Sequence, residues 1–471
     1  MQPGRRAAVA LVFGSSAAVL VVEIVALRLL APYLGLTLET STLVIAIALG
    51  AIAFGSWQGG VVADQGRPER WLAPIFAVSG LVVALTPVLV RGAGEVSPGL
   101  VLLVAGCAIL VPGALLSAVT PIVTKLQLSS LDETGAVVGR LSGISTVGSI
   151  VGTVITGFVL ISVIPVSWIL IGLGSLLVLV SLLLGPVLRS LGGAVGAVAV
   201  IGLAGLAAEV GPGRCDVETR YHCAVVEQDP DRASGRTLVL DDLRHSYVDL
   251  EDPTFLEFEY VKAMAAVVDT WWPAGETIDA HHVGGGGLTL PRYLEATRPG
   301  TRNVVSEIDP GVIRIDRDQL DADIPVRVED GRLGLAALEP DSLDLVVGDA
   351  FGGMSVPWHL TTAEAVGQVR RALRDDGVYV LNVIDYRTLR FARAEVATLQ
   401  ATFDHVAVAG DDDGGNLVLV ASDRPIDVEA IAADFGARDL PWEFQRDVTA
   451  WVDGADVLTD DRAPIDQLIS R

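Results

Sequence analysis

The chain has 471 residues, room for two or three domains, and a formal net charge of −24. The charge is unevenly spread: residues 1–210 hold 9 Lys+Arg and 8 Asp+Glu, and the remainder holds 24 and 49, a net charge of −25. A nearly uncharged half is typical of lipid-facing protein, and an acidic half of a solvated domain. Because so acidic a domain repels phosphate backbones, the composition argues against nucleic acid as a partner.

Apolar runs fill the first half of the chain. A transmembrane helix needs ~20 apolar residues, and we predict about seven, over 7–30, 41–62, 72–91, 98–119, 139–161, 165–185 and 190–210. The first run exceeds a signal-peptide core, so we expect a signal anchor. Buried helices of a soluble protein are the less favoured alternative, because charges almost vanish over six consecutive runs. Residues 1–210 are therefore predicted to form a transmembrane helical bundle.

Small and ionisable residues mark this predicted bundle. Glycines four residues apart let helices approach closely in lipid, and such pairs are Gly55 and Gly59, Gly139 and Gly143, Gly148 and Gly152, and Gly192 and Gly196. Glu23 lies within the first run, where an ionisable group is costly and often functional. A structural polar contact between helices is the alternative for Glu23.

Loop charges predict the orientation of the bundle. With seven helices, the N-terminal side holds Arg5, Arg6, Arg67, Arg70, Lys125, Arg140 and Arg189, and the other side holds Arg28, Arg91, Arg214 and Arg220. The positive-inside rule then places the N-terminus in the cytoplasm. We expect a multi-pass protein of the cell membrane, with the lipid bilayer as a partner. The odd helix count favours an extracytoplasmic acidic domain, although one miscounted helix reverses this assignment.

Two cysteines follow the last apolar run. Cys215 and Cys223 lie in a predicted linker over 211–236, and such a pair forms a disulfide in an oxidising compartment. Two free thiols are the alternative. A zinc site with His222 and His245 is a weaker one, since no Cys-x-x-Cys pair exists, and no metal is predicted.

Short strands and helices alternate after the linker. We predict a β-hairpin over 237–241 and 246–250, helices over 254–270, 288–297 and 361–374, and strands over 278–283, 303–308, 326–329, 343–347 and 378–383. Alternation of this kind indicates a parallel sheet with helices on both faces. Residues 237–471 are therefore predicted to form a Rossmann-like α/β domain of the methyltransferase type.

Glycines and carboxylates follow the predicted strands at their carboxyl ends, where such sheets bind ligands. Glycines let the backbone approach a ligand closely, and the next helix offers unpaired N–H groups. An acidic residue after the second strand suits ribose hydroxyls. The residues are Gly284, Gly285, Gly286 and Gly287 after the first strand, Glu307 and Asp309 after the second, Asp330 and Gly331 after the third, and Asp349 after the fourth. Together they predict a nucleoside-binding edge.

Several motifs resemble those of a known family. These are Leu-Val-Leu-Asp-Asp (238–242), Val-Gly-Gly-Gly (283–286), Ser-Glu-Ile-Asp-Pro (306–310), Glu-Asp-Gly (329–331) and Gly-Asp-Ala-Phe (348–351). With them, residues 237–420 resemble the spermidine synthase family of aminopropyltransferases. The stretches Val-Pro-Trp-His-Leu-Thr-Thr (356–362) and Leu-Thr-Asp-Asp-Arg-Ala-Pro (458–464) look like its branch with an N-terminal membrane bundle.

The resemblance implies aminopropyl transfer from decarboxylated S-adenosylmethionine, or a related S-adenosyl donor, as co-substrate to a small amine. No tightly bound cofactor is implied, and a homodimer is compatible with it. Glu307 would bind the ribose, Asp330 the adenine, and Asp349 would help to deprotonate the attacking amine. His245 and Tyr260 occupy substrate-binding positions of the family. A carboxylate that only caps the turn after its strand is the alternative for Asp349.

Some positions depart from the family. Gly287 and Gly352 stand where the family has Asp, Val261 follows Tyr260 where it has His, and His245 replaces Gln. The two missing carboxylates would hold cationic amines, so we expect an altered polyamine site. Two alternative functions remain: transfer of another group, such as methyl, from an S-adenosyl donor, and a non-catalytic binding or transport-associated role.

Overall fold

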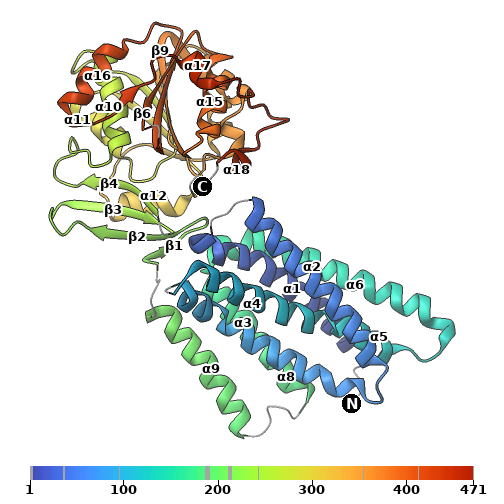
Figure 1. Ribbon diagram of the computed structural model, residues 1–471. Helices are drawn as coiled ribbons and strands as arrows, with labels where there is room; N and C mark the ends of the chain where they lie inside the picture. Colours follow the sequence, from blue (N-terminus) through green and yellow to red (C-terminus); the bar gives the residue numbers. More distant parts are fainter. Residues whose placement is uncertain are drawn as a thin grey trace. The chain divides into compact units, whose positions relative to one another are not determined.

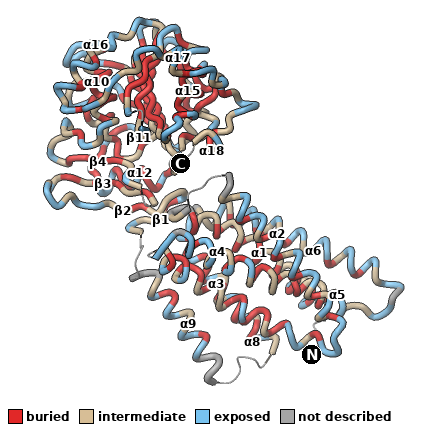
Figure 2. Tube along the Cα trace, viewed as in Figure 1, coloured by how far each residue is buried: buried red, intermediate tan, exposed pale blue. Residues whose placement is uncertain are grey.

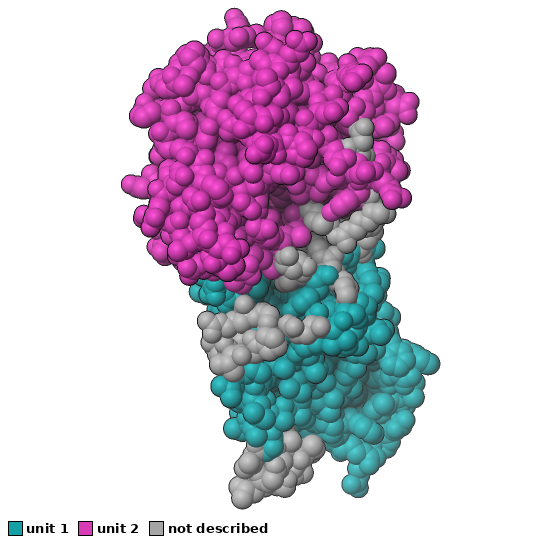
Figure 3. Space-filling model, turned by 60° about the vertical axis from the view of Figure 1, so that its left-hand side comes forward, with its two compact units in different colours: residues 1–223 teal, residues 224–471 magenta. Residues whose placement is uncertain are grey.

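The computed structural model describes residues 4–34, 38–94, 96–185, 191–210, 215–241, 243–353, 355–411 and 413–469. They form two compact units, Met1–Cys223 and Ala224–Arg471 (Figure 3). Three residues used above, Arg189, Arg214 and Asp242, lie outside the described residues.

The first unit is helical. Its long elements are α1 (Arg5–Leu34), α2 (Leu38–Ala63), α3 (Leu72–Gly94), α4 (Pro98–Ser117), α6 (Thr134–Ile155), α8 (Val166–Leu184) and α9 (Leu191–Val210) (Figure 1). The shorter ones are η1 (Pro68–Trp71), α5 (Val119–Gln127), η2 (Leu131–Glu133), the π-helical η3 (Thr156–Leu160) and α7 (Ile161–Val163).

Among the described residues, six helical spans are long and apolar enough to cross a membrane. They are Arg5–Leu30, Thr40–Ala63, Pro68–Gly94, Gly99–Gln127, Thr134–Leu160 and Val166–Leu184. The predicted seventh run is also a helix, α9 (Leu191–Val210), of which the stretch Gly196–Ala207 is apolar among the residues whose side chains are described. The chain therefore has a helix at each of the seven predicted runs, and six of them are long and apolar enough to cross a membrane.

Two of the predicted glycine pairs lie at close helix contacts. A Cβ on Gly55 would lie 2.0 Å from the Ala114 oxygen of α4, and one on Gly148 would lie 2.4 Å from the Phe13 oxygen of α1. Their partners Gly59 and Gly152 are equally crowded. The prediction was wrong for Gly139, Gly143 and Gly196, where an added Cβ would meet nothing within 4 Å.

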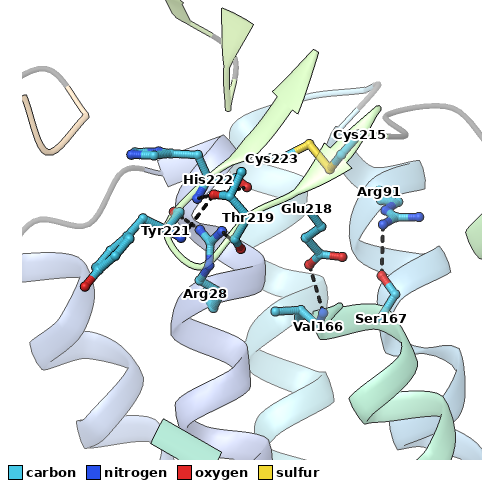
Figure 4. The surroundings of a disulfide bond; sticks show 10 residues. All are labelled: Arg28, Arg91, Val166, Ser167, Cys215, Glu218, Thr219, Tyr221, His222 and Cys223. Carbon is cyan, nitrogen blue, oxygen red and sulfur yellow. Dashed lines mark hydrogen bonds between the residues drawn. A yellow bond between two sulfur atoms is a disulfide. The ribbon is translucent and has the colours of Figure 1, made fainter. Parts of the chain in front are cut away.

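A disulfide closes a short loop at the end of the first unit (Figure 4). Cys215 and Cys223 are joined, and Arg28 of α1 donates hydrogen bonds to the carbonyls of Thr219 and Tyr221 inside the loop. Glu218 accepts a hydrogen bond from the backbone N–H of Val166, where α8 begins (2.9 Å). The loop is therefore fastened to two helices of its own unit.

The predicted hairpin belongs to a larger antiparallel sheet. Its strand order is β1 (Val217–Glu218), β2 (Cys223–Gln228), β3 (Gly235–Leu240) and β4 (Leu243–Asp249). Strands β1 and β2 fall within 211–236, the range predicted as a linker, and the second unit begins at Ala224.

An eight-stranded sheet forms the centre of the second unit, in the order β12-β10-β11-β9-β8-β5-β6-β7. The strands are β5 (Asp279–Val283), β6 (Arg302–Glu307), β7 (Val326–Val328), β8 (Leu343–Gly348), β9 (Leu373–Tyr386), β10 (His405–Gly410), β11 (Gly414–Ser422) and β12 (Glu443–Phe444). Neighbours from β7 to β9 are parallel, as predicted. Strands β11, β10 and β12 continue the sheet antiparallel, which the purely parallel prediction missed.

Helices cover both faces of this sheet, whose strands are largely buried (Figure 2). Successive residues of β8 point to opposite faces: Val346 packs with the core under α14 (Ala363–Ala372) and α15 (Arg390–Gln400). Leu345 and Val347 pack under α10 (Glu259–Trp271), α11 (Thr289–Thr297) and α16 (Val428–Ala437). The remaining helices are α12 (Pro310–Asp318), α13 (Gly331–Ala336), η5 (Trp358–Leu360), α17 (Val448–Val452) and α18 (Ile465–Leu468).

Candidate active site

The strand order reverses at one position of the sheet. If the parallel strands are numbered along the chain from β5, they lie in the sheet in the order 3-2-1-4-5. The order reverses between β5 and β8, which are neighbours in the sheet although β6 and β7 lie between them in the sequence. Open α/β sheets bind ligands at such a switch point, outside the carboxyl ends of the strands. All the predicted strand-end residues are therefore brought to this edge.

The glycine loop after β5 passes close to the end of β8. Gly284 has φ +106°, and a Cβ there would lie 2.3 Å from the Asp349 carbonyl oxygen, so only glycine fits. The Asp349 N–H donates to the Val283 carbonyl (2.9 Å), which ties the two strand ends together. At Gly286, by contrast, an added Cβ would have its nearest neighbour at 3.9 Å.

Gly287 closes the loop against two other elements. Its φ is +73°, and a Cβ would lie 2.0 Å from the Ser246 hydroxyl oxygen of β4. Its N–H donates to the Asp316 carboxyl of α12 (2.9 Å). Asp316 is fully buried, and desolvation raises the pKa of its carboxyl well above the ordinary value. The loop therefore rests on a buried carboxyl, and a side chain at position 287 would be strained.

Glu307, at the end of β6, faces the glycine loop. Its carboxylate accepts hydrogen bonds from the N–H groups of Gly285 (2.8 Å) and Asp309 (2.7 Å). Asp309 is itself fully buried, and its side chain caps α12 by accepting from the Gly311 N–H (2.8 Å). The Asp309 side chain thus supports α12, and its predicted place among the cofactor-binding residues stays a prediction.

Asp330 follows β7 and begins α13. One carboxylate oxygen caps the helix through the Arg332 N–H (2.9 Å), and the other lies 3.1 Å from Nε2 of His359. Gly331 lets α13 approach β5, because a Cβ there would lie 2.5 Å from Val283 Cγ1. The next residue, Arg332, pairs with Asp460, so the two motifs 356–362 and 458–464 both support this corner.

Asp349, at the end of β8, is surrounded by hydrogen-bond donors. Nδ2 of Asn382 donates to its Oδ1 at 2.9 Å. Desolvation raises the pKa of the Asp349 carboxyl to about 6, and hydrogen bonds from Asn382 and Tyr260 limit the rise. Burial and the Asp349 charge hold the pKa of Tyr260 well above its ordinary value, so the phenol stays a donor. The same hydroxyl lies 3.3 Å from the His245 carbonyl oxygen, so its single hydrogen is donated either to that carbonyl or to Asp349.

The positions that depart from the family have different surroundings. Gly352 bridges to Ser355, and an added Cβ there would have its nearest neighbour at 4.0 Å. Val261 is 5% exposed within the hydrophobic core. Position 352 therefore has room for a side chain, whereas position 261 faces the core.

Sequence analysis missed four side chains of this edge: Asn382, Asn416, His359 and Asp316. His359 lies in a motif that was noticed, but its partner Asp330 is distant in sequence. The two asparagines lie on β9 and β11, where their pairing depends on strand register. The cap role of Asp309 did have a signal, because Asp followed by Pro is typical of a helix N-terminus.

The second unit thus has a Rossmann-like fold, with glycines and carboxylates at the carboxyl ends of its parallel strands. No family model matches the chain. It is 30% identical over 168 residues to a probable polyamine aminopropyl transferase of Bifidobacterium longum, covering 35% of this chain and 36% of that one. It is also 30% identical over 144 residues to a polyamine aminopropyltransferase of Chromobacterium violaceum, covering 29% of this chain and 53% of the relative.

One solved structure, of a probable spermidine synthase from Corynebacterium glutamicum, is 28% identical, with a TM-score of 0.49 over 52% of this chain and 95% of the other. The chain spans about a third to a half of the length of the two curated relatives. Over the matched residues, the chain is similar to aminopropyltransferases.

Proposed function

We propose that this chain is a membrane-bound aminopropyltransferase-like enzyme, which transfers an aminopropyl group from decarboxylated S-adenosylmethionine to a small amine. The observation that carries the proposal is the set of three carboxylates, Glu307, Asp330 and Asp349, on successive parallel strand ends around one glycine loop. The similarity to named aminopropyltransferases supports it.

Each carboxylate has a proposed role. Glu307 accepts two backbone N–H groups, and its remaining lone pairs suit the ribose hydroxyls. Asp330, anchored by His359, would accept from the adenine amino group. The close passage of Gly284 beside Asp349 would bring the donor sulfonium near the reacting amine. Tyr260 and His245 would border the acceptor.

The reaction needs one base. The amine nitrogen forms a bond to the carbon next to the sulfonium, the carbon–sulfur bond breaks, and its electron pair returns to sulfur as methylthioadenosine leaves. The surplus proton passes from nitrogen to Asp349. With a pKa of about 6 the carboxyl is ionised at neutral pH, yet more basic than an ordinary Asp.

The acceptor side supports an altered specificity. Gly287 and Gly352 provide no carboxylate for a cationic chain. This observation favours, as a second candidate, transfer of a different group from ordinary S-adenosylmethionine. A non-catalytic ligand-binding or transport-associated role is the third candidate function. An assay for catalytic turnover distinguishes it from the two enzymatic candidates.

The test is turnover by the purified full chain. With decarboxylated S-adenosylmethionine and putrescine we expect release of methylthioadenosine. Asp349→Asn should abolish release, since an amide cannot accept the proton, while the donor still binds with the affinity that protonated Asp349 gives at low pH. Donor binding without methylthioadenosine across several amines would reject the proposal, and methylation of an acceptor with ordinary S-adenosylmethionine would favour the second candidate.

We also propose that the chain crosses the cell membrane several times and exposes the second unit outside the cytoplasm. This side requires α9 to be a seventh span beside the six long apolar ones, and the loop charges and the Cys215–Cys223 disulfide support it. A membrane-impermeant thiol reagent tests it on intact cells that carry Cys107→Ser, which removes the free cysteine of α4. Labelling only after reduction fits the outside location. Labelling that requires lysis, without reductant, places the unit in the cytoplasm.

A further inference from the structure

Three polar side chains lie in a row across three strands of the central sheet. Parallel pairing of Gly348 with Leu381 places Asp349 beside Asn382 of β9. Antiparallel pairing of Asn382 with Val418 places Asn416, two residues earlier on β11, on the same face. The register therefore aligns Asp349, Asn382 and Asn416, although β11 lies beyond the parallel part of the sheet.

Hydrogen bonds connect the row in one direction. Asn382 donates through Nδ2 to Asp349 Oδ1 (2.9 Å), and Asn416 donates through Nδ2 to Asn382 Oδ1 (3.0 Å). Asn382 is 2% exposed, so solvent does not compete for its amide. If the Asn382 amide were rotated by 180°, its oxygen would face Asp349 Oδ1 and its nitrogen would face the Asn416 nitrogen. Asn416 thus fixes the orientation in which Asn382 presents a donor to the carboxylate.

We propose that Asn382 and Asn416 form a two-amide relay that positions the Asp349 carboxylate and keeps it ionised for proton abstraction. This inference rests on the proposed function and adds two positioning residues to it. Neither amide can accept a proton, so the relay holds one carboxylate oxygen and leaves the other for the amine. The Asn382 amide, whose own oxygen accepts from Asn416, stabilises the Asp349 carboxylate without adding a charge.

The neighbours of Asp349 are consistent with this role. Its titratable neighbour is Tyr260 of α10, which donates a hydrogen bond, and His245 of β4 lies behind Tyr260 through its carbonyl. Both the phenol and the Asn382 amide lower the pKa of the carboxyl against the effect of desolvation. Loss of the amide donor should therefore raise the pH at which Asp349 ionises.

The test measures how the affinity of the full chain for decarboxylated S-adenosylmethionine depends on pH, by calorimetry. The donor is a cation, so its binding should strengthen as Asp349 ionises. In Asn382→Leu the midpoint should move up by about one to two pH units, the worth of one hydrogen bond to a charged group. Asn416→Leu should shift it in the same direction by less, because Asn382 remains. The acid limb of methylthioadenosine release should move in parallel.

Asn303→Leu is the matched control, because Asn303 is 4% exposed and bonded to His282 and the Pro291 carbonyl, away from Asp349. An unchanged midpoint in both relay variants would overturn the inference, and so would an equal shift in the control. Shifted midpoints without any turnover would support the relay and reject only the reaction. Absence of donor binding by the unmodified chain would overturn both.

Discussion

Removal of the Glu307 carboxylate should weaken donor binding in two ways. The side chain holds the N–H groups of Gly285 and Asp309 at 2.8 and 2.7 Å, so it orders the glycine loop in addition to its proposed contact with the ribose. In Glu307→Ala the lost charge-assisted contacts to the ribose are worth about 1.5–3 kcal/mol, or ~10- to 100-fold in affinity. Glu307→Gln keeps one acceptor and should lose less.

Calorimetry with decarboxylated S-adenosylmethionine measures this effect on the full chain in detergent. Glu339→Ala, at an exposed position in the turn before β8, is the control and should bind like the unmodified chain. The melting temperature without ligand, recorded for each variant, separates loop disorder from ligand contact. Equal affinities for Glu307→Ala and the unmodified chain would refute the nucleoside site at this strand end.

Three further predictions concern other parts of the chain. Position 352 has room for a side chain, so Gly352→Asp should lower the KM for putrescine by restoring a carboxylate for an ammonium. Gly287→Asp should instead lower the melting temperature, because Gly287 has a positive φ and lies against Ser246. An unchanged KM in Gly352→Asp would show that position 352 does not face the acceptor. Desolvation raises the pKa of buried Glu395, so the stability that its protonated carboxyl gives the fold is present at low pH and lost as pH rises through the folded pKa. Glu395→Gln should therefore raise the melting temperature more at alkaline than at acid pH. A melting-temperature difference that does not depend on pH would contradict this. Cys215→Ser should destabilise the disulfide loop by roughly 2–3 kcal/mol. Limited proteolysis should then cleave the variant within 215–223 sooner than the unmodified chain, and equal cleavage rates of the two proteins would count against the prediction.

The parallel half of the fold was predictable because its strands are short apolar runs followed by glycine or acidic residues. Strands β5, β6 and β8 lie within a residue or so of their predicted ranges. Strands β10 to β12 were missed: β10 and β11 form an antiparallel hairpin, which joins the sheet only through the pairing of β11 with β9, distant in sequence. The linker prediction did not include β2, a short segment that has a strand conformation through its pairing with β3.

The candidate site was predictable where one residue at a strand end determines the chemistry, as with Glu307 and Asp349. It was not predictable where two strands contribute to one contact. Asn416 reaches the site only through the register of β11 on β9, and His359 only through its contact with Asp330. Asp309 shows the opposite case: a carboxylate at the right strand end that turns inward to cap α12.

The most direct test is a structure of the full chain with methylthioadenosine bound. We predict both ribose hydroxyls within hydrogen-bond distance of the Glu307 carboxylate, about 2.6–3.0 Å. The adenine amino group should face Asp330, and the thioether sulfur should lie next to the Asp349 carboxylate, over the glycine loop. Methylthioadenosine bound elsewhere, or absent from this edge of the sheet at saturating concentration, would contradict the account.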